Sequence, residues 1–257
     1  MLKIISIFNQ KGGVGKSTTT INLGAALGQK NKSILIVDID PQGNTTRGLG
    51  VDKRALKTSI YDILINEYNI NDLTIKTSAK NVFLVPSNVE LAGAEVELIE
   101  LKERELRLKR ALEKVEEIYD YILIDCPPSL GILSINALTA SHSVLIPIQC
   151  EYYALEGVSQ LVDTIKLVKK SLNPALDIEG VVLSMFDGRT NLSIQVVDEV
   201  KKYFKGKVYT SIIPRNVRLA EAPSHGISVI DYDPKSKGAE AYMDLAEEFI
   251  ELSEEEI

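Results

Sequence analysis

The octapeptide Lys-Gly-Gly-Val-Gly-Lys-Ser-Thr at residues 11–18 constrains this chain more than any other feature. An apolar run over residues 2–8 precedes it, and a helical pattern over residues 19–27 follows it. Strand, glycine-rich turn and helix is the setting that a phosphate-binding loop requires. Glycines let backbone N–H groups surround an anion, and the helix adds its free N-terminal amides and its dipole. The sequence therefore predicts that a nucleoside triphosphate contacts Lys11, Gly12, Gly13, Val14, Gly15, Lys16, Ser17 and Thr18.

Three polar side chains complete the predicted ATP and Mg²⁺ site. Lys16 can reach the β- and γ-phosphates, and Ser17 supplies a hydroxyl for Mg²⁺. Asp125 ends the apolar run 121–124. A carboxylate at such a strand end can hold a water molecule of the Mg²⁺ shell, which is the Walker B role. We expect Ser17 and Asp125 to be the metal-binding residues.

Short apolar runs rich in β-branched residues alternate with helical patterns along the chain, and they predict the fold. Continuously apolar runs are expected for strands covered on both faces; they span residues 2–8, 33–38, 82–85, 121–125, 143–147, 179–185 and 207–213. Helical spacing joins Leu101, Leu108, Ala111, Leu112, Val115 and Ile118, and also Ala154, Val158, Leu161, Val162, Ile165 and Val168. The alternation predicts one α/β domain over residues 1–257, with a mostly parallel twisted sheet and helices on both faces, of the P-loop NTPase type.

Composition limits the classes to which the chain can belong. Its 257 residues contain no apolar stretch of about 20 residues, the length needed to cross a bilayer. The first strand begins at once, and this leaves no room for a secretory signal. Cys126 and Cys150 adjoin apolar runs and are expected to be small buried residues of a reduced, cytoplasmic protein. The net charge of −7 means that any contact with nucleic acid requires a local basic patch.

The phosphate loop departs from the general pattern in a way that indicates a family. Gln10 occupies the place of the usual first glycine, and Lys11 is an additional cation at the front of the loop. With Gly12 and Gly13 beside it, Lys11 resembles the signature lysine of the "deviant Walker A" ATPases, the ParA/MinD family. Residues 180–189, 214–226 and 232–239 further resemble chromosomal ParA proteins of the Soj subgroup. These matches run from residue 3 to about residue 250, with one local departure at Ile227–Ser228.

This resemblance implies a role for several residues. In the family, the lysine that corresponds to Lys11 reaches across a dimer interface to the nucleotide of the other subunit. Asp40 resembles the switch carboxylate that orients the attacking water, so Lys11, Lys16 and Asp40 form the expected catalytic set. Pro214 and Asn216 are implied to lie against the adenine. For the neighbouring Asp38, a structural role in capping a turn and a functional role are equally good interpretations.

The resemblance also implies a DNA-segregation ATPase with ATP and Mg²⁺ as its cofactors. ATP would allow a homodimer that binds double-stranded DNA without sequence preference, and a ParB-type partner protein would stimulate hydrolysis. Such a protein is cytoplasmic and nucleoid-associated. Arg189 and Arg218 lie in the family segments where arginines contact DNA. The other expected DNA-contacting residues are Lys201, Lys202, Lys235 and Lys237, although lysines of this kind also simply solvate a helix.

Three other functions share the same loop. The nearest is a MinD-type membrane-cycling ATPase, which needs a basic amphipathic C-terminal helix. Here the predicted C-terminal helix has an apolar stripe of Ala239, Tyr242, Met243, Ala246, Phe249 and Ile250, opposite the acidic Glu240, Asp244, Glu247, Glu248 and Glu251. Anionic lipid repels such a face, so no membrane contact is expected. The others are an iron–sulfur carrier of the nitrogenase iron-protein type and a scaffold that binds ATP without hydrolysing it.

Overall fold

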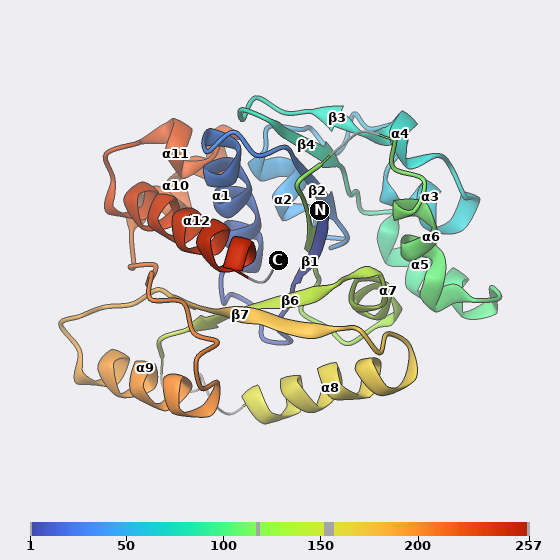
Figure 1. The fold of residues 1–257 in the computed structure, drawn as a ribbon. Helices are drawn as coiled ribbons and strands as arrows, with labels where there is room; N and C mark the ends of the chain where they lie inside the picture. Colours follow the sequence, from blue (N-terminus) through green and yellow to red (C-terminus); the bar gives the residue numbers. More distant parts are fainter. Residues whose placement is uncertain (1, 117–118, 152–156, 256–257) are drawn as a thin grey trace.

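A seven-stranded sheet lies at the centre of the computed structural model, which describes residues 2–116, 119–151 and 157–255 (Figure 1). The strand order is β3-β4-β2-β5-β1-β6-β7, and only the edge strand β3 is antiparallel to its neighbour. The strands are β1 Lys3–Ile7, β2 Ile34–Asp38, β3 Ile75–Lys76, β4 Val82–Val85, β5 Tyr121–Asp125, β6 Ser143–Gln149 and β7 Asp177–Ser184.

Helices connect the strands and cover both faces of the sheet. The α-helices are α1 Lys16–Gln29, α2 Asn44–Gly48, α3 Ile60–Asn66, α4 Ile70–Leu73, α5 Leu91–Glu97, α6 Arg107–Leu112, α7 Ile132–Ala140, α8 Val158–Ser171, α9 Asn191–Tyr203, α10 Val217–Glu221, α11 Val229–Tyr232 and α12 Lys237–Glu255. Short 3₁₀ turns are η1 Leu98–Glu100, η2 Arg104–Leu106 and η3 Ala222–His225.

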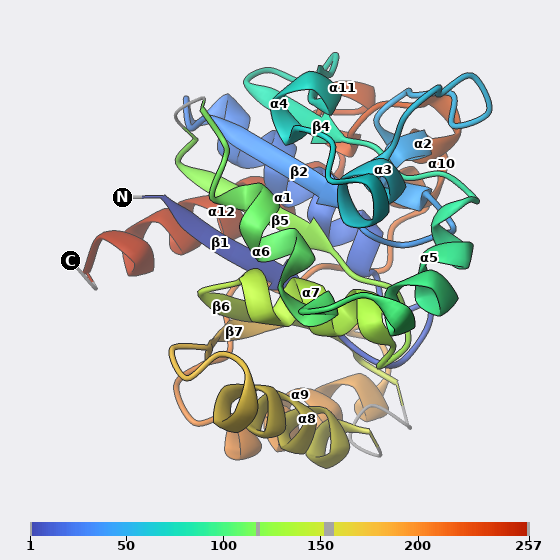
Figure 2. The ribbon, with the colours of Figure 1, turned by 90° about the vertical axis from the view of Figure 1, so that its right-hand side faces the viewer.

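The alternation of side chains along each strand divides the core into two layers. In β2, Leu35 and Val37 pack with residues of α3 and α5 to α9 on one face. Ile34 and Ile36 pack with α1 and the C-terminal helices on the other face. Figures 1 and 2 show α1, α11 and α12 on one side of the sheet, and α8 and α9 beside β6 and β7 on the other. This confirms the predicted fold class.

The carboxyl ends of three central strands meet at one edge of the sheet. Asp125 pairs in register with Ile7 of β1 and with Asp38 of β2. The glycine-rich loop leaves the sheet directly after β1, between its neighbours β5 and β6. Ligands of parallel α/β sheets bind beyond the carboxyl ends of the strands, so this edge is where a site is expected.

Six of the seven predicted strands are present, and the seventh prediction is wrong. Residues 207–213 run beside β7, but they form only an isolated bridge between Val208 and Val181. The carboxylate of Glu248 in α12 accepts hydrogen bonds from the N–H groups of Thr210 (2.7 Å) and Ser211 (2.9 Å). Those amides therefore do not extend the ladder. The two-residue strand β3 was not predicted, because a pair of residues carries no periodic signal.

The C-terminal helix docks on the core, as its apolar stripe predicts. Ala239, Tyr242 and Phe249 are at most 1% exposed, and α12 packs along α1. The Tyr242 hydroxyl lies 3.1 Å from Oγ1 of Thr19 in α1. Two residues used in the sequence analysis, Ile118 and Ala154, lie outside the described residues.

Close packing of α1 on the sheet edge gives a stability prediction. A Cβ atom at Gly28 would lie 2.1 Å from the carbonyl oxygen of Lys80 and 3.2 Å from Val82. Backbone cannot yield as a flexible side chain can, so Gly28→Ala should destabilise the fold by about 1–3 kcal/mol despite its better helix propensity. Urea unfolding measures this change. Gly157→Ala is the control, because a Cβ there meets nothing within 4 Å; equal midpoints for the two variants would contradict the packing argument.

Candidate active site

The loop after β1 has the backbone geometry of an anion cradle. Gly13 and Gly15 have φ values of 75° and 93°, in the left-handed region that L side chains rarely adopt. Gly15 is the N-cap of α1, so the free N-terminal amides of this helix follow the loop directly. The hydroxyl of Ser184, at the end of β7, donates a 2.8 Å hydrogen bond to the carbonyl oxygen of Val14 and anchors the loop.

Lys16 is a buried cation at the start of α1. Its residue is 7% exposed, and Nζ donates a 3.0 Å hydrogen bond to the carbonyl oxygen of Lys11. Burial lowers the pKa of Lys16, while the nearby carboxylates of Asp125 and Asp40 raise it. An ammonium group can donate three hydrogen bonds, so Lys16 can also donate to an anion in the loop.

Asp125 is fully buried at the end of β5 and is surrounded by hydroxyl groups. Thr45 donates a 2.6 Å hydrogen bond to Oδ2, and Thr20 donates one of 3.4 Å to Oδ1. Burial raises the pKa of Asp125, and the hydrogen bonds from Thr45 and Ser17 oppose that shift. The structure therefore brings together the side-chain oxygens of Ser17 and Asp125. Oxygen atoms are the ligands that Mg²⁺ prefers.

Asp40 lies at the same edge of the sheet, in the loop that follows β2, and is 5% exposed. Its Oδ1 accepts a 2.9 Å hydrogen bond from the N–H of Gln42, and its carbonyl oxygen accepts one of 2.7 Å from the hydroxyl of Ser87. These bonds fix the carboxylate where it lines the same cleft as Lys16. It is placed to hold a polar group, such as a water molecule, near the loop.

Asp38 has a structural set of hydrogen bonds. Its carboxylate accepts from the N–H of Thr46 (2.8 Å), the hydroxyl of Thr46 (2.7 Å) and the N–H of Asp40 (3.2 Å). Burial and the neighbouring Asp125 raise the pKa of Asp38. Of the two interpretations left open by the sequence, the contacts favour the turn-capping one.

Two adjoining cavities open at this edge. The larger, of about 580 Å³, is lined by the glycine-rich loop, Lys16 and Asp40. The smaller, of about 350 Å³, adjoins it at Gly15 and Thr18 and is lined by Pro214 and Asn216. Oδ1 of Asn216 caps α10 through a 2.8 Å hydrogen bond from the N–H of Arg218. The side-chain amide nitrogen of Asn216 can donate to a ligand in this cavity.

The front lysine of the loop does not line its own cleft. The Lys11 residue is exposed, and its backbone N–H is held by Oδ1 of Asn9 at 3.0 Å. Its side chain borders a separate small hollow beside β6 and α8. Among the described residues, no hydrogen bond or ion pair of the Lys11 side chain is found. This ammonium group is therefore not committed to a partner within the described part of the chain.

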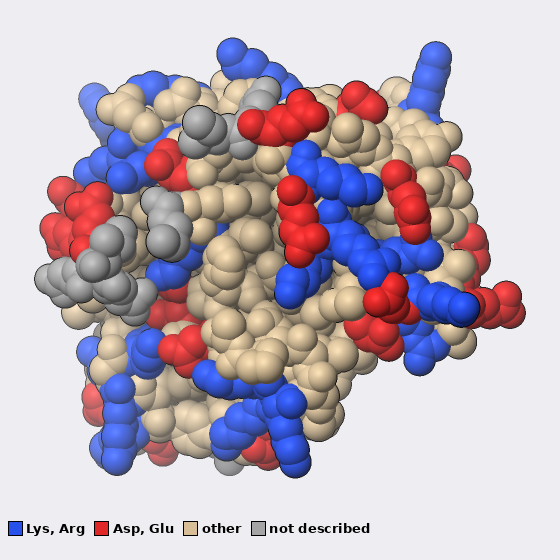
Figure 3. All heavy atoms as spheres, turned by 45° about the vertical axis from the view of Figure 1, so that its right-hand side comes forward, with Lys and Arg blue, Asp and Glu red and all other residues tan. Residues whose placement is uncertain are grey.

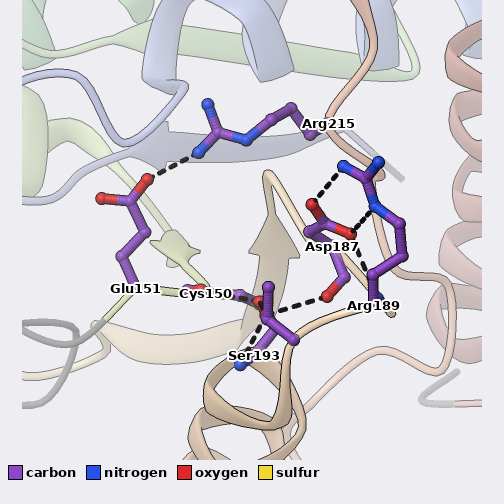
Figure 4. Close-up of polar contacts among 7 residues, drawn as sticks. Cys150, Glu151, Asp187, Arg189, Ser193 and Arg215 are labelled. Carbon is purple, nitrogen blue, oxygen red and sulfur yellow. Dashed lines mark hydrogen bonds and ion pairs between the residues drawn. The ribbon is translucent and has the colours of Figure 1, made fainter.

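The arginines predicted to contact DNA are paired with carboxylates of this chain. Arg189 donates to both oxygens of Asp187, at 2.8 and 2.6 Å, and its side chain is 87% exposed (Figure 4). These bonds lower the pKa of Asp187 to about 2. Arg218 pairs with Glu221 at 2.8 Å and with Asp233 at 3.2 Å.

The lysines predicted to contact DNA are all exposed: Lys201, Lys202, Lys235 and Lys237. The first two occupy the last turn of α9, whose Val196, Val197 and Val200 are buried. Tyr203, in the same turn, is 49% exposed. Figure 3 shows one face of the molecule, on which basic and acidic side chains interleave over much of the surface. No broad basic field covers that face.

Some residues of the site have no signal in the sequence. Thr45 contacts Asp125 across 80 positions, and Met185 borders both cavities with a φ of 54°. A non-glycine residue in the left-handed region beside a cavity is characteristic of functional sites. Arg47 also lines the larger cavity, and only the three-dimensional arrangement places it there.

Both cysteines are free and buried, as predicted, and burial raises the pKa of each thiol. Within residues 2–116, 119–151 and 157–255, no cluster of three or more His, Cys, Asp or Glu side chains could hold a metal ion by itself. In the same part of the chain, no helix is both long and apolar enough to cross a membrane.

The chain is similar to several known proteins. A family model described as an AAA domain matches residues 2–178. The chain is 61% identical over 248 residues to the sporulation initiation inhibitor protein Soj of Bacillus subtilis, covering 96% of this chain and 98% of that protein. It is 49% identical over 250 residues to the chromosome-partitioning ATPase Soj of Treponema pallidum, covering 97% and 98%.

A solved structure shares the fold over nearly the whole chain. It is described as cobyrinic acid a,c-diamide synthase from Mycobacterium smegmatis, with bound ATP analogue and magnesium. Its TM-score is 0.85 at 38% identity, over 96% of this chain and 93% of that one.

Proposed function

This chain belongs to the Soj/ParA family of chromosome-partitioning ATPases, and from that membership we propose how it works. It is an ATPase that forms ADP and phosphate. Residues 1–257 act as one P-loop ATPase domain, and ATP joins two copies into a sandwich dimer. The dimer binds double-stranded DNA without sequence preference, and a ParB-type partner stimulates hydrolysis. The observation that carries the proposal is the cradle at Gly13 and Gly15, with a buried lysine and two carboxylates around it.

The donor set fits ATP with Mg²⁺. The loop amides and Lys16 hold the phosphates, while Pro214 and Asn216 border the cavity that takes the adenine. Ser17 and Asp125 hold Mg²⁺, directly or through a water molecule. When bound, the ion neutralises charge on the β- and γ-phosphates.

Hydrolysis requires mainly positioning and charge stabilisation from the chain. Asp40 orients a water molecule whose oxygen bonds to the γ-phosphorus, while the bond from that phosphorus to the β–γ bridging oxygen breaks. Lys16 stabilises the charge within the subunit. Lys11, whose side chain lies outside its own cleft, supplies a second cation to the nucleotide of the other copy.

DNA binding rests on exchangeable ion pairs. The Arg189 side chain is 87% exposed, so its pair with Asp187 contributes little to stability and can be exchanged for a DNA phosphate. A dimer presents each arginine twice, and two weak patches then act as one bivalent site. The six proposed DNA-contacting residues are Arg189, Arg218, Lys201, Lys202, Lys235 and Lys237.

Arg189→Glu should weaken DNA binding about tenfold at low salt and leave ATP-dependent dimerisation intact. The dimer loses about two phosphate contacts, so the slope of log affinity against log salt should also fall by about 2. Fluorescence anisotropy with a labelled duplex at several salt concentrations measures both effects. Arg110→Glu is the matched control, because Arg110 is also exposed and paired, with Glu103 on another part of the surface. Equal binding by the two variants would remove Arg189 from the DNA surface.

Co-sedimentation with plasmid DNA in ATP, in ADP and without nucleotide tests the proposed cycle as a whole. We expect the protein in the pellet only with ATP, since only the dimer offers paired patches. Equal sedimentation in all three conditions would contradict nucleotide control of DNA binding.

The MinD-type alternative is disfavoured by the C-terminal helix. Its apolar stripe packs against α1, and its outer face carries the exposed acidic residues Glu240, Asp244, Glu247 and Glu251. A helix already docked by its apolar side, with a negative outer face, has no surface for anionic lipid. Flotation with anionic liposomes and ATP would revive this alternative if the protein rose with the vesicles.

A further inference from the structure

A second polar pocket adjoins the nucleotide cleft. It has a volume of about 530 Å³ and is bordered by Arg47, Lys53 and Arg54 on one wall, and by the segment 223–226 on the other. We call it the arginine pocket. Arg47 belongs to the walls of both this pocket and the larger cavity of the active site, so the two spaces are neighbours.

The charge pattern of the chain sets this pocket apart. Six of its eight arginines form an ion pair with a carboxylate: Arg104, Arg107, Arg110, Arg189, Arg215 and Arg218. Within the described part of the chain, the remaining two have no such partner, and both border the arginine pocket. Those two, Arg47 and Arg54, are exposed residues. In a chain of net charge −7, two unpaired guanidinium groups in one concave site indicate an anionic ligand.

The other charged residues of the pocket are consistent with an anion. Asp52 is the single acidic residue in its lining, and Oδ1 of Asp52 accepts a 3.0 Å hydrogen bond from the N–H of Arg54. Lys53 donates to the carbonyl oxygen of Gln42. With three cations and one carboxylate, the lining has a net positive charge. Guanidinium groups match phosphate oxygens in a bidentate geometry.

The two walls of the pocket approach each other closely at two glycines. A Cβ at Gly226 would lie 2.6 Å from the Cα of Gly50, and one at Gly50 would lie 2.9 Å from the carbonyl oxygen of Gly226. Both glycines have a positive φ. The pocket therefore has a preformed shape, so a ligand does not have to bring the walls together.

We propose that the arginine pocket binds a phosphate-bearing anion distinct from the nucleotide in the phosphate loop. Lys53 connects this site to the active site, because it contacts Gln42, whose N–H holds the carboxylate of Asp40. An anion in the pocket competes with the Gln42 carbonyl for Lys53. The same phosphate chemistry is available from a free polyphosphate and from the backbone of DNA.

Calorimetric titration with inorganic tripolyphosphate in metal-free buffer tests the site. The wild-type chain should bind two equivalents, one in the phosphate loop and one in the arginine pocket. Lys16→Ala should retain only the second. In the Lys16→Ala background, Arg54→Ala should weaken that remaining affinity tenfold or more, and Lys53→Ala should weaken it as well. Arg110→Ala, which removes a paired arginine elsewhere, should leave it unchanged.

The result that overturns the proposal is equal tripolyphosphate affinity in Lys16→Ala with and without Arg54→Ala, both folded by circular dichroism. A gel-shift assay of otherwise native Arg54→Ala protein with ATP then identifies the source of the phosphate. Weakened DNA binding together with weakened tripolyphosphate binding assigns the pocket to DNA, and unchanged DNA binding assigns it to a free anion. If the wild-type chain did not bind ATP, that result would count against the proposed function. The tripolyphosphate comparison would remain valid.

Discussion

Lys16→Ala should abolish detectable ATP binding, with an affinity at least about 100-fold below wild type, or about 2.7 kcal/mol. Lys16 is a buried cation whose Nζ has one backbone acceptor and whose pKa is lowered by burial. Burial leaves this ammonium group with little water around it, so hydrogen bonds from it to triphosphate oxygens contribute strongly to binding. Titration calorimetry with ATP and Mg²⁺ measures the loss.

The same variant should remain folded, because Asp125 keeps its hydrogen bonds from Thr45 and Thr20 when the ammonium group is removed. Lys205→Ala, which removes an exposed lysine after α9, serves as the control. If Lys16→Ala bound ATP as the wild type does, the assignment of the phosphate loop would be wrong.

Asp40→Ala should bind ATP normally yet hydrolyse it about 10²–10⁴-fold more slowly, the usual contribution of a positioned acid–base group. The carboxylate lies in the cleft near Lys16 and Asp125, so its loss makes the cleft less negative and does not weaken phosphate binding. The ATP-bound dimer should consequently persist. Single-turnover phosphate release and light scattering in ATP measure the two effects.

Two variants control for the structure of the Asp40 turn. Asp40→Asn keeps an oxygen that can accept from the N–H of Gln42, so it should slow hydrolysis while preserving the loop. Asp244→Ala, on the exposed face of α12, should change neither property. Wild-type turnover in Asp40→Ala would exclude this residue from the reaction.

The local sequence was sufficient to predict six of the seven strands and the glycine-rich turn between β1 and α1. Continuous apolar runs such as 121–125 identify strands buried on both faces, and glycines with a following Lys-Ser identify the loop. Residues 207–213 look the same in sequence, but Glu248 from α12 takes two of their amides, and this contact spans 38 positions for Thr210. No local pattern encodes such competition.

The local sequence also could not predict which carboxylates the arginines pair with. Arg215 pairs with Glu151, 64 positions away, as Figure 4 shows. Thr45 reaches Asp125 from a separate helix. Contacts of this kind depend on which strand ends meet at the sheet edge, and that order is set by the packing of the whole domain.

The central claim is that ATP holds two copies together, with each Lys11 directed to the nucleotide of its neighbour. The most direct measurement is a crystal structure of the Asp40→Ala variant with ATP and Mg²⁺. The account predicts a two-fold dimer in which Nζ of Lys11 contacts the γ-phosphate held by the other copy. A structure with ATP bound and Lys11 turned to solvent, away from any second chain, would contradict it.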